Sequence, residues 1–532
     1  MKTTLLRLSR RAACLVLAGG LLTSCSLLPA ASPRHEGTAA SQAPQYYSDA
    51  WLSDDSLHYV YSYVGNGGGT ILRGGRVLYK ASSSDSIQLL KDTLTGETGH
   101  YLVAHSTPGT EERTSTLYDA DGNAVMTFPY AVNATLSGGL LILRDDADVW
   151  AFENGTTRVY DLATGAQLPV PETALDCLVV DEDGQRLIFN CYDLPEGLTY
   201  AYDDPDQPLH QYVLITDREG NVLMREDGCT ASSLASYRGG FADWLDLSWF
   251  RGSDWGITRE ALYNVTTGEL LTGEEDSAVS ACGVGVACLQ SRQDSRSVLY
   301  DLNGGEAVEL GRFDWAVNTY TPGCVVLSGS DDPDSPYTLI DLASGESIGV
   351  QRRDTDYRSG NVAVLTTDNI LKVYDGTTGA LLTDVEAAPV EEAQYISVTA
   401  LPDGYALLQY DDENYNTIAI QTYGGEGLLW SSAGEAQQYT YASYLTSTAS
   451  GPLLTACRDS RDGSSLYDVL DMEGDLLLRR LGSCYSPDDL PDDCFVARQG
   501  FDYGLMDSTG QWLYRESIFS SPSDDAGGGY LY

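Results

Sequence analysis

The sequence predicts an all-β fold, a β-propeller of four-stranded antiparallel blades, on the strength of three observations. A short phrase recurs along most of the chain, in the order apolar strand, Asp, a few small or polar residues, Gly, apolar strand. Its glycines return at a nearly regular interval, and we find no long run of apolar residues with helical spacing. The clearest copies of the phrase occupy residues 117–126, 159–168 and 339–348.

Each copy of this phrase encodes a tight β-hairpin. The Asp side chain caps the turn by hydrogen bonding to the backbone of the turn itself. Gly supplies the positive φ that a tight turn needs. The turn glycines are Gly75, Gly122, Gly165, Gly220, Gly268, Gly305, Gly345, Gly379, Gly427, Gly474 and Gly510. These eleven turns span 435 residues (510 − 75), so their mean interval is 43.5 residues. A period in the low forties with one strong hairpin per unit is typical of propeller blades.

The unit at residues 394–430 shows a complete blade. Strands are expected at 396–401, 405–410, 417–423 and 428–430. The number of units leaves the architecture open, because eleven exceeds the four to eight blades usual for one ring. About eight to eleven units are therefore expected, in one large ring or in two joined rings, with some turns as extras inside blades.

The stretch YGLMDSTGQWLY, from Tyr503 to Tyr514, resembles a bacterial WG repeat. Copies of Asp-x-x-x-Gly-x-x-Leu elsewhere resemble the blades of quinoprotein-type and WD-repeat propellers. The resemblance covers residues 46–520 and implies a propeller architecture. Its motifs encode a hairpin and not a site, so it implies no particular activity.

The N-terminus resembles the export signal of a bacterial lipoprotein. Four basic residues precede an apolar run from Ala12 to Leu22, which is too short to span a bilayer comfortably. The sequence Leu22-Thr-Ser-Cys25 then resembles a lipobox. This resemblance implies that the Cys25 thiol receives a diacylglyceryl group before cleavage ahead of it. The alternative is an ordinary signal peptide with a chance cysteine.

These features predict three parts: a lipoprotein signal peptide at residues 1–24, a flexible tether at 25–45 and a propeller domain at 46–532. The tether is predicted from its Ala, Ser and Pro content. Because two or more acyl chains give stable anchoring, we expect the protein at the cell membrane, lipid-anchored on its extracytoplasmic face.

The mature chain is strongly acidic. The full sequence has a formal net charge of −46, and residues 1–24 contribute four positive charges and no acids, which leaves 27 − 77, or −50. This balance argues against nucleic acid, or an anionic lipid surface, as the direct partner. Solubility outside the cytoplasm is the simplest explanation of the charge.

Eleven cysteines become nine once Cys14 and Cys25 are set aside, so complete intramolecular pairing is impossible. Cys177 and Cys191 form the best candidate disulfide, since they lie symmetrically about the Asp183-Gly184 turn. The alternative is two buried free thiols. The cysteine spacings do not match a zinc site.

No residue pattern predicts a catalytic site, and we expect no enzyme, no cofactor and no metal. The acidic loops at 331–334, 411–414 and 488–493 have clustered oxygens of the kind that calcium binds, but solvated loop tips explain them better. No Gly-x-Ser-x-Gly elbow is present, and no carboxylate pair stands out among 77 acids.

One aromatic stretch is a candidate binding site. It contains Trp244, Trp249, Phe250 and Trp255, together with Asp243, Asp246 and Asp254. Exposed indoles beside carboxylates suit sugar or peptide binding, whereas buried ones are blade core. We hypothesise that at least one of the three tryptophans is exposed.

The function predicted from these features is a protein- or glycan-binding scaffold module on a membrane-anchored lipoprotein. Two alternatives belong to other classes: an extracytoplasmic glycan hydrolase on a propeller fold, and an assembly factor for envelope proteins.

Overall fold

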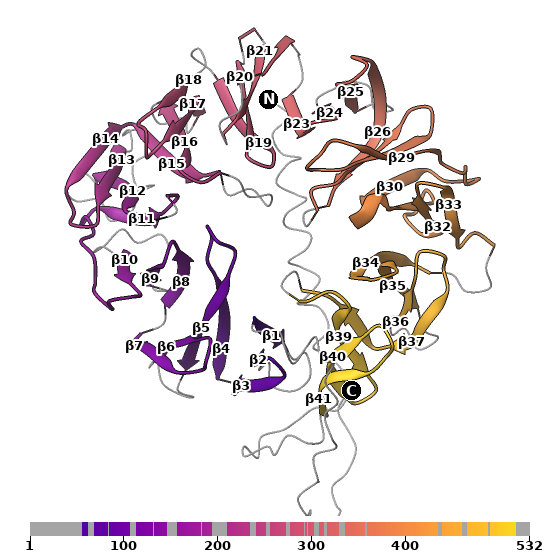
Figure 1. The fold of residues 1–532 in the computed structure, drawn as a ribbon, viewed down its shortest axis with the longest axis horizontal. Coiled ribbons are helices and arrows are strands. Elements are labelled where there is room, and N and C mark those ends of the chain that lie inside the picture. The colour runs from indigo at the N-terminus through magenta and orange to yellow at the C-terminus, as the bar shows by residue number, and fades with distance from the viewer. Residues whose placement is uncertain are drawn as a thin grey trace, which may run out of the picture. The chain divides into compact units, whose positions relative to one another are not determined.

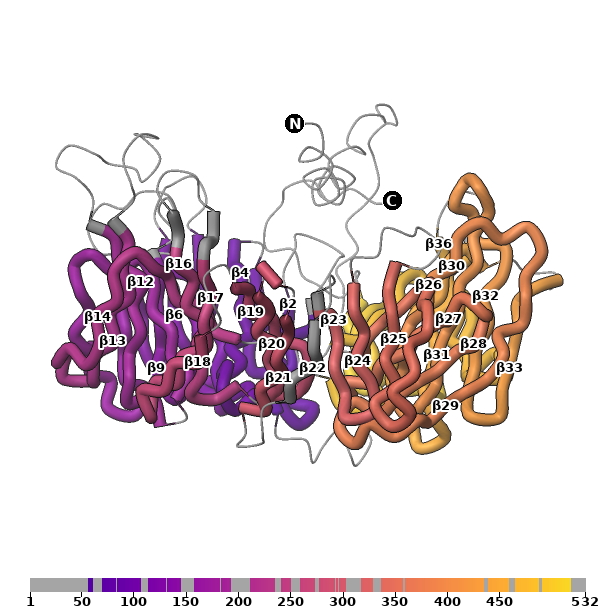
Figure 2. Tube along the Cα trace, turned by 90° about the horizontal axis from the view of Figure 1, so that it is seen from above, coloured from indigo at the N-terminus to yellow at the C-terminus, as the bar shows by residue number. Residues whose placement is uncertain are grey.

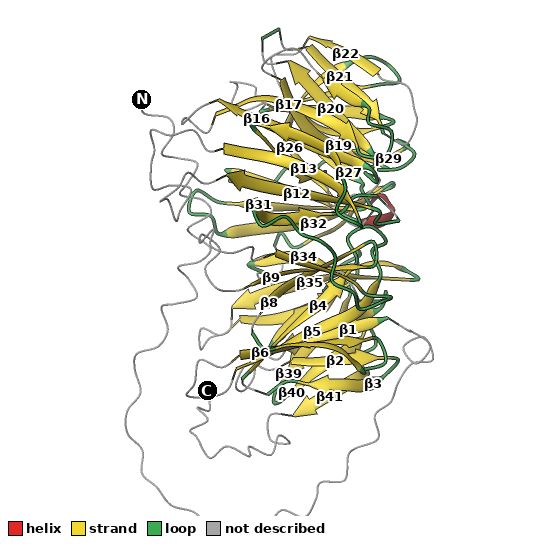
Figure 3. Cartoon of the chain, turned by 90° about the vertical axis from the view of Figure 1, so that its left-hand side faces the viewer, coloured by secondary structure: helices red, strands yellow, loops and turns green. Residues whose placement is uncertain are grey.

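The computed structural model describes residues 56–517, apart from 62–68, 83, 107–112, 131, 146–156, 182, 194–209, 235–240, 252–255, 273–276, 292, 295, 303–307, 313–315, 329–335, 357–358, 435–438, 460–464 and 488–489. Among these residues the regular structure is antiparallel β-strand, with a single 3-10 turn at Pro402–Gly404 (Figure 3). The described part contains no helix long and apolar enough to cross a membrane. Cys25, the predicted signal peptide and the predicted tether lie outside the described residues.

The strands form ten sheets that follow one another in chain order (Figure 1). Seven of the sheets described have four strands each, as predicted for blades. The strands of the first five sheets are β1 Leu57–Tyr61, β2 Gly69–Arg73 and β3 Arg76–Lys80; β4 Asp85–Lys91, β5 Thr98–Ser106, β6 Arg113–Asp119 and β7 Ala124–Phe128; β8 Val132–Ser137, β9 Leu140–Asp145 and β10 Thr157–Asp161; β11 Ala174–Leu178, β12 Arg186–Asp193, β13 His210–Asp217 and β14 Val222–Asp227; β15 Cys229–Ser233, β16 Trp244–Arg251, β17 Gly256–Asn264 and β18 Leu270–Thr272.

The remaining strands complete the series. They are β19 Ser277–Gly283, β20 Val286–Ser291, β21 Arg296–Asp301 and β22 Val308–Arg312; β23 Ala316–Thr321, β24 Cys324–Ser328, β25 Tyr337–Asp341, β26 Ser347–Thr355, β27 Val362–Thr366, β28 Ile370–Tyr374 and β29 Leu381–Glu386; β30 Tyr395–Ala400, β31 Ala406–Asp411, β32 Thr417–Gly424 and β33 Gly427–Ser431; β34 Tyr441–Thr448, β35 Gly451–Asp459, β36 Ser465–Leu470 and β37 Leu476–Leu481; β38 Ser483–Tyr485, β39 Cys494–Gln499, β40 Asp502–Asp507 and β41 Trp512–Ser517.

The seven-stranded sheet explains how eleven predicted turns fit into ten sheets (Figure 2). The first half of β26 pairs with β25, for example Ser347 with Ile340. Its second half pairs with β27, for example Thr355 with Val362, after a register shift near Val350. One long strand is therefore the outer strand of one unit and the inner strand of the next, and the sheet contains two repeat units.

The predicted turn chemistry is confirmed. Ten of the eleven turn glycines have a positive φ, and Gly305 lies outside the described residues. In the turn at Asp119, the carboxylate accepts the backbone N–H groups of Asp121 and Asn123, and the Gly122 N–H donates to the Asp119 carbonyl. The repeat thus specifies a local hairpin, as the Asp and Gly positions require.

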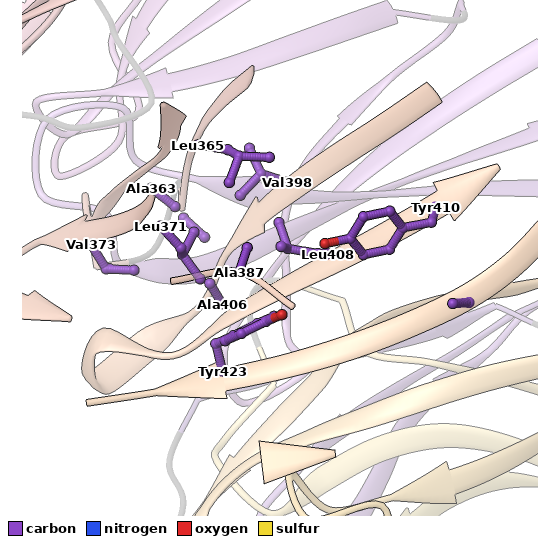
Figure 4. Packing of buried hydrophobic residues seen from close by; sticks show 12 residues of the cluster. Ala363, Leu365, Leu371, Val373, Ala387, Val398, Ala406, Leu408, Tyr410 and Tyr423 are labelled. Carbon is purple, nitrogen blue, oxygen red and sulfur yellow. The ribbon is translucent and has the colours of Figure 1, made fainter. Parts of the chain in front are cut away.

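Buried apolar clusters join each repeat unit to its neighbours. In one of them, residues of β27 and β28 pack against residues of β30, β31 and β32 (Figure 4). A further cluster brings Val60 and Leu72, from the first sheet, against Val496, Leu505 and Tyr514 of the last sheet. The predicted fold class, all-β with four-stranded antiparallel sheets, is confirmed.

The first and last sheets are also joined by a polar cluster around Glu516. Lys80 Nζ lies 2.9 Å from Glu516 Oε1, and the hydroxyls of Tyr503 and Tyr514 donate to the same carboxylate. Burial tends to raise the pKa of Glu516, but these hydrogen bonds and the Lys80 charge outweigh it, so the pKa is lowered. Glu516 is therefore held as a carboxylate between residues at the two ends of the described chain.

Candidate functional site

The two described tryptophans of the predicted aromatic site, Trp244 and Trp249, do not come together. Trp244 is 6% exposed and packs with Leu262 and Ala287, while its Nε1 donates to the Leu302 carbonyl at 3.3 Å. It therefore belongs to the core between the sheets β15–β18 and β19–β22. The hypothesis that Trp244 belongs to an exposed binding surface is wrong, because the neighbouring sheet β19–β22 covers its side chain.

Trp249 packs in the opposite direction. It contacts the cluster between β11–β14 and β15–β18, and its Nε1 donates to Glu226 Oε1 at 3.2 Å. The Arg259 guanidinium lies over its ring, 4.5 Å from the centroid. Trp244 and Trp249 are five positions apart on β16, so their side chains point to opposite faces of the sheet. The side chain of Phe250 and all of Trp255 lie outside the described residues.

Asp246, also in this stretch, is close to the carboxyl group of Glu260. Burial, followed by the charge of Glu260, raises the pKa of Asp246 to about 7. Glu260 Oε2 accepts the backbone N–H of Val279 in the next sheet at 2.6 Å, and the Ser232 hydroxyl donates to Asp246 Oδ2 at 3.4 Å. The pair lies in a packed contact between sheets, which is not the open cleft that a hydrolase requires.

The predicted disulfide is not formed in the structure. Cys177 and Cys191 are buried free thiols in one apolar cluster. The hairpin register places Cys191 opposite Ala174, and Cys177 opposite Phe189, with a bulge near Asp176. Symmetry about the turn therefore gave the wrong register: next to the turn Cys177 already pairs with Phe189, and the bulge, which lies beyond Cys177, only places Cys191 opposite Ala174. Burial raises the pKa of Cys191 to about 11, so this thiol stays protonated at neutral pH.

The acidic loops contain no metal site among the residues that the structure describes, where no cluster of three His, Cys, Asp or Glu residues has suitable geometry. The loop at 331–334 lies outside the described residues. In the loop at 411–414, the Asp412 carboxylate is already used: it accepts the backbone N–H groups of Asn414 and Asn416 at 2.8 and 2.9 Å. This carboxylate shapes a turn.

That turn presents the aromatic pair that sequence reasoning missed. Tyr415 follows Asp412 in the loop between β31 and β32, and its side chain is exposed (70%). Its ring stacks on that of Tyr395, with centroids 4.4 Å apart and planes 14° apart. Tyr395 is 37% exposed. Their side chains form an exposed surface that we call the tyrosine platform, defined as Tyr395 and Tyr415.

The platform is held in place by hydrogen bonds below it. Tyr395 lies opposite Asp411, and Asp411 lies opposite Thr417. The Thr417 hydroxyl is 2.9 Å from Asp411 Oδ1 and 2.8 Å from the carbonyl of Thr440, which precedes the next sheet. The turn therefore stands on a base that is tied to two sheets.

The backbone of Tyr415 is in an unusual conformation. Its φ is +62°, in the left-handed region that bulky residues rarely adopt. The Asp412 cap and the hydrogen bond from the Tyr415 N–H to the Asp412 carbonyl, at 3.1 Å, hold it there. Such strain costs on the order of 1 kcal/mol and is often found at functional positions.

The contact between the two tyrosines changes the pKa of Tyr395. The hydrogen bond with the Tyr415 side chain raises the pKa of Tyr395, and the charge of Tyr415 adds to this effect. The Tyr395 ring is therefore a neutral phenol at physiological pH. A pair of stacked, nearly parallel rings open to solvent can bind a planar group on its outer faces.

Two apolar cores support the sheet that carries the platform. On one face, Val398, Leu408 and Tyr410 pack against the β27–β28 residues (Figure 4). On the other face, Leu407 and Ile420 pack with residues of the sheet β34–β37. The exposed tyrosines thus extend from a rigid element, as a preformed binding surface requires.

Comparison with known proteins adds little about chemistry. A family model described as a domain of unknown function (DUF5046) matches residues 262–525, and a search of curated proteins found no match. Solved structures that are similar to this chain include BamB from Moraxella catarrhalis, a eukaryotic initiation factor, and an oligogalacturonate lyase in complex with manganese.

These structures are only distantly similar. BamB is 13% identical, with 63% of this chain and 99% of that chain covered, at a TM-score of 0.27. The initiation factor is 11% identical, with 72% and 96% covered and a TM-score of 0.33. The lyase is 14% identical, with 61% and 95% covered and a TM-score of 0.27. At such scores, none of them supports an activity or a partner for this chain.

Proposed function

We propose that this protein is a membrane-anchored extracytoplasmic lipoprotein whose all-β part binds a protein or glycan partner and acts as a scaffold. The anchor is Cys25, as the lipobox-like sequence implies. The binding surface is the tyrosine platform. The observation that carries the proposal is the stacked, exposed pair Tyr395 and Tyr415, since exposed aromatic side chains on a rigid base are costly unless a partner covers them.

The anchor is tested by changing Cys25→Ser. We expect this variant to leave the membrane fraction, because it lacks the thiol that carries the acyl chains. A variant that sediments with membranes as tightly as the parent would show that Cys25 is not the anchor.

The binding surface is tested by photo-crosslinking in living cells. The photo-reactive residue p-benzoylphenylalanine is placed at position 415 in one variant and at position 441 in another. Tyr441 is a matched control because it is exposed (48%) and begins β34, as Tyr395 begins β30. We expect a discrete adduct from position 415 only. Equal adducts from both positions, or none from position 415, would contradict the proposal.

We also propose that the repeat units form a single closed series, not two joined rings. Support comes from the apolar cluster between the first and last sheets, and from the Lys80–Glu516 ion pair. Treatment with a carbodiimide, which joins amines to carboxylates in contact, should yield a cross-linked peptide containing Lys80 and Glu516. If Lys80 is recovered unlinked while the Lys372–Asp384 ion pair, at 3.0 Å, is cross-linked, the closure is wrong.

A further inference from the structure

The tyrosine platform lies in a part of the chain that has no positive charge of its own. Residues 373–457 contain no Lys, Arg or His, and they contain eleven acids. These acids are Asp375, Asp384, Glu386, Glu391, Glu392, Asp403, Asp411, Asp412, Glu413, Glu426 and Glu435. A partner that binds here meets a local excess of negative charge over 85 residues (457 − 373 + 1).

Part of this charge lies directly beside the platform in the sequence. Glu391 and Glu392 precede Tyr395 in the connection that leads into β30, and both are exposed. Glu413 precedes Tyr415 in its turn and is also exposed. One cation also reaches this strand: Arg352 Nε donates to the backbone carbonyl of Ile396, the residue after Tyr395, at 2.6 Å. The three exposed carboxylates beside the rings in the sequence therefore outnumber this one guanidinium, which is already engaged by a carbonyl.

Aromatic rings and carboxylates together select a cation. The face of a phenol ring carries negative electrostatic potential, so it attracts a guanidinium or ammonium group. A guanidinium is planar, stacks on an aromatic ring and can also donate to a carboxylate, which an ammonium does less well. A neutral sugar would use the ring faces and could donate hydroxyl hydrogen bonds to the carboxylates, but it carries no positive charge to complement theirs.

We propose that the partner of the tyrosine platform is an extended, arginine-bearing peptide segment of an exported or envelope protein. An arginine guanidinium stacks on the outer face of Tyr415, and neighbouring arginines pair with the exposed carboxylates. The charge complementarity of residues 373–457 argues for this occupant. This inference rests on the proposed function, because it names the partner of that same surface.

The test uses the full mature chain and a fluorescein-labelled peptide of alternating serine and arginine, followed by fluorescence anisotropy at about 0.15 M salt, where long-range attraction is largely screened. We expect saturable binding that Tyr415→Gly weakens by at least about fivefold, the range of one cation–π contact. Glycine adopts the positive φ at this position without strain, so the variant keeps its fold. Tyr441→Ala is the matched control and should bind as the parent does.

Three further measurements separate the possible outcomes. Tyr395→Phe keeps the ring and should bind within about twofold of the parent, because the phenol oxygen is not needed for the π contact. The same peptide with glutamate in place of arginine should not bind. Glu413→Gln should weaken binding and reduce its dependence on salt, because one local negative charge is removed.

Some results would overturn the inference. If the arginine peptide binds equally to the parent and to Tyr415→Gly, its attraction is general to the acidic chain and the platform is not its site. If a neutral oligosaccharide such as chitotetraose binds in a Tyr415-dependent manner and the arginine peptide does not, the cationic partner is wrong while the proposed binding surface stands. If the binding of neither the arginine peptide nor the oligosaccharide depends on Tyr395 or Tyr415, and position 415 gives no adduct in cells, both proposals fail.

Discussion

The sheets β15–β18 and β30–β33 both carry clustered aromatic residues, but they use them in different ways. In the first, Trp244 begins β16 and Trp249 lies further along the same strand. Their side chains are directed to opposite faces, where neighbouring sheets bury Trp244 and partly bury Trp249. In the second, Tyr395 begins a strand and Tyr415 lies in a turn, and both remain exposed. Trp244 and Tyr395 both begin a strand, so the place of a residue along its strand does not decide its exposure; what differs is whether a neighbouring sheet covers the side chain.

The largest effect is expected from Trp244→Ala. Removal of this buried indole leaves a cavity between two sheets, which should lower the free energy of unfolding by about 3–5 kcal/mol. Chemical denaturation followed by circular dichroism measures this change. A loss below about 1 kcal/mol would mean that Trp244 is not core, and the distinction between the two sheets would then disappear.

A smaller but clear loss is expected from Gly474→Ala, which tests a packed aromatic of the second sheet. Gly474 has a φ of +81°, and an added Cβ would lie 2.2 Å from Cδ1 of Trp430 in β33. Left-handed strain and the forced movement of the indole should together destabilise the protein by about 2–3 kcal/mol. Gly434→Ala is the control, because it has a similar φ of +79° but open space around its Cβ. Equal losses in the two variants would show that Trp430 does not pack there.

The third effect depends on pH. The pKa of Asp246 is raised to about 7 in the folded protein, whereas it is about 3.9 in an unfolded chain. Between these values the folded state holds a proton that the unfolded state has released, so the stability present at low pH is lost as pH rises through 7. Asp246→Asn removes this loss, so it should stabilise the protein by about 1 kcal/mol at pH 8, and less at pH 5. Denaturant midpoints at both pH values would show it, and an unchanged difference between them would contradict it.

The smallest effect on stability is expected at the platform itself. Tyr415→Gly removes an exposed side chain at a position that favours glycine, so the free energy of unfolding should change by less than about 0.5 kcal/mol. Thermal unfolding of the variant should coincide with that of the parent. A large loss would mean that Tyr415 is structural and that its exposure has no bearing on binding.

The sequence was sufficient to predict what depends on local chemistry. The Asp-Gly turns and the four strands of 394–430 follow from residue types that have few other conformations, and the structure confirms them. The sequence did not predict that two repeat units share β26. The two halves of this strand differ only in their partner, which is β25 for the first half and β27 for the second.

The candidate site was harder to predict because it depends on which faces are covered. Trp244 and Trp249 drew attention as large aromatics, yet packing between sheets decides their burial. The register of this hairpin, which places Phe189 and not Cys191 opposite Cys177, also has no sequence signature that we used. The signal for the platform was present in Tyr415, which lies between Asp412 and Asn416 in a short turn where large side chains cannot be buried.

Hydroxyl-radical footprinting with mass spectrometry tests the central contrast most directly, because it reports solvent access residue by residue in the intact protein. Free tryptophan and free tyrosine are both readily oxidised, so the comparison depends on exposure. We predict rapid oxidation of Tyr415 and Tyr395 and strong protection of Trp244, with protection of the two tyrosines when the arginine peptide is added. Oxidation of Trp244 as fast as that of Tyr415 would contradict the account, since the two sheets would then not differ in how they use their aromatic residues.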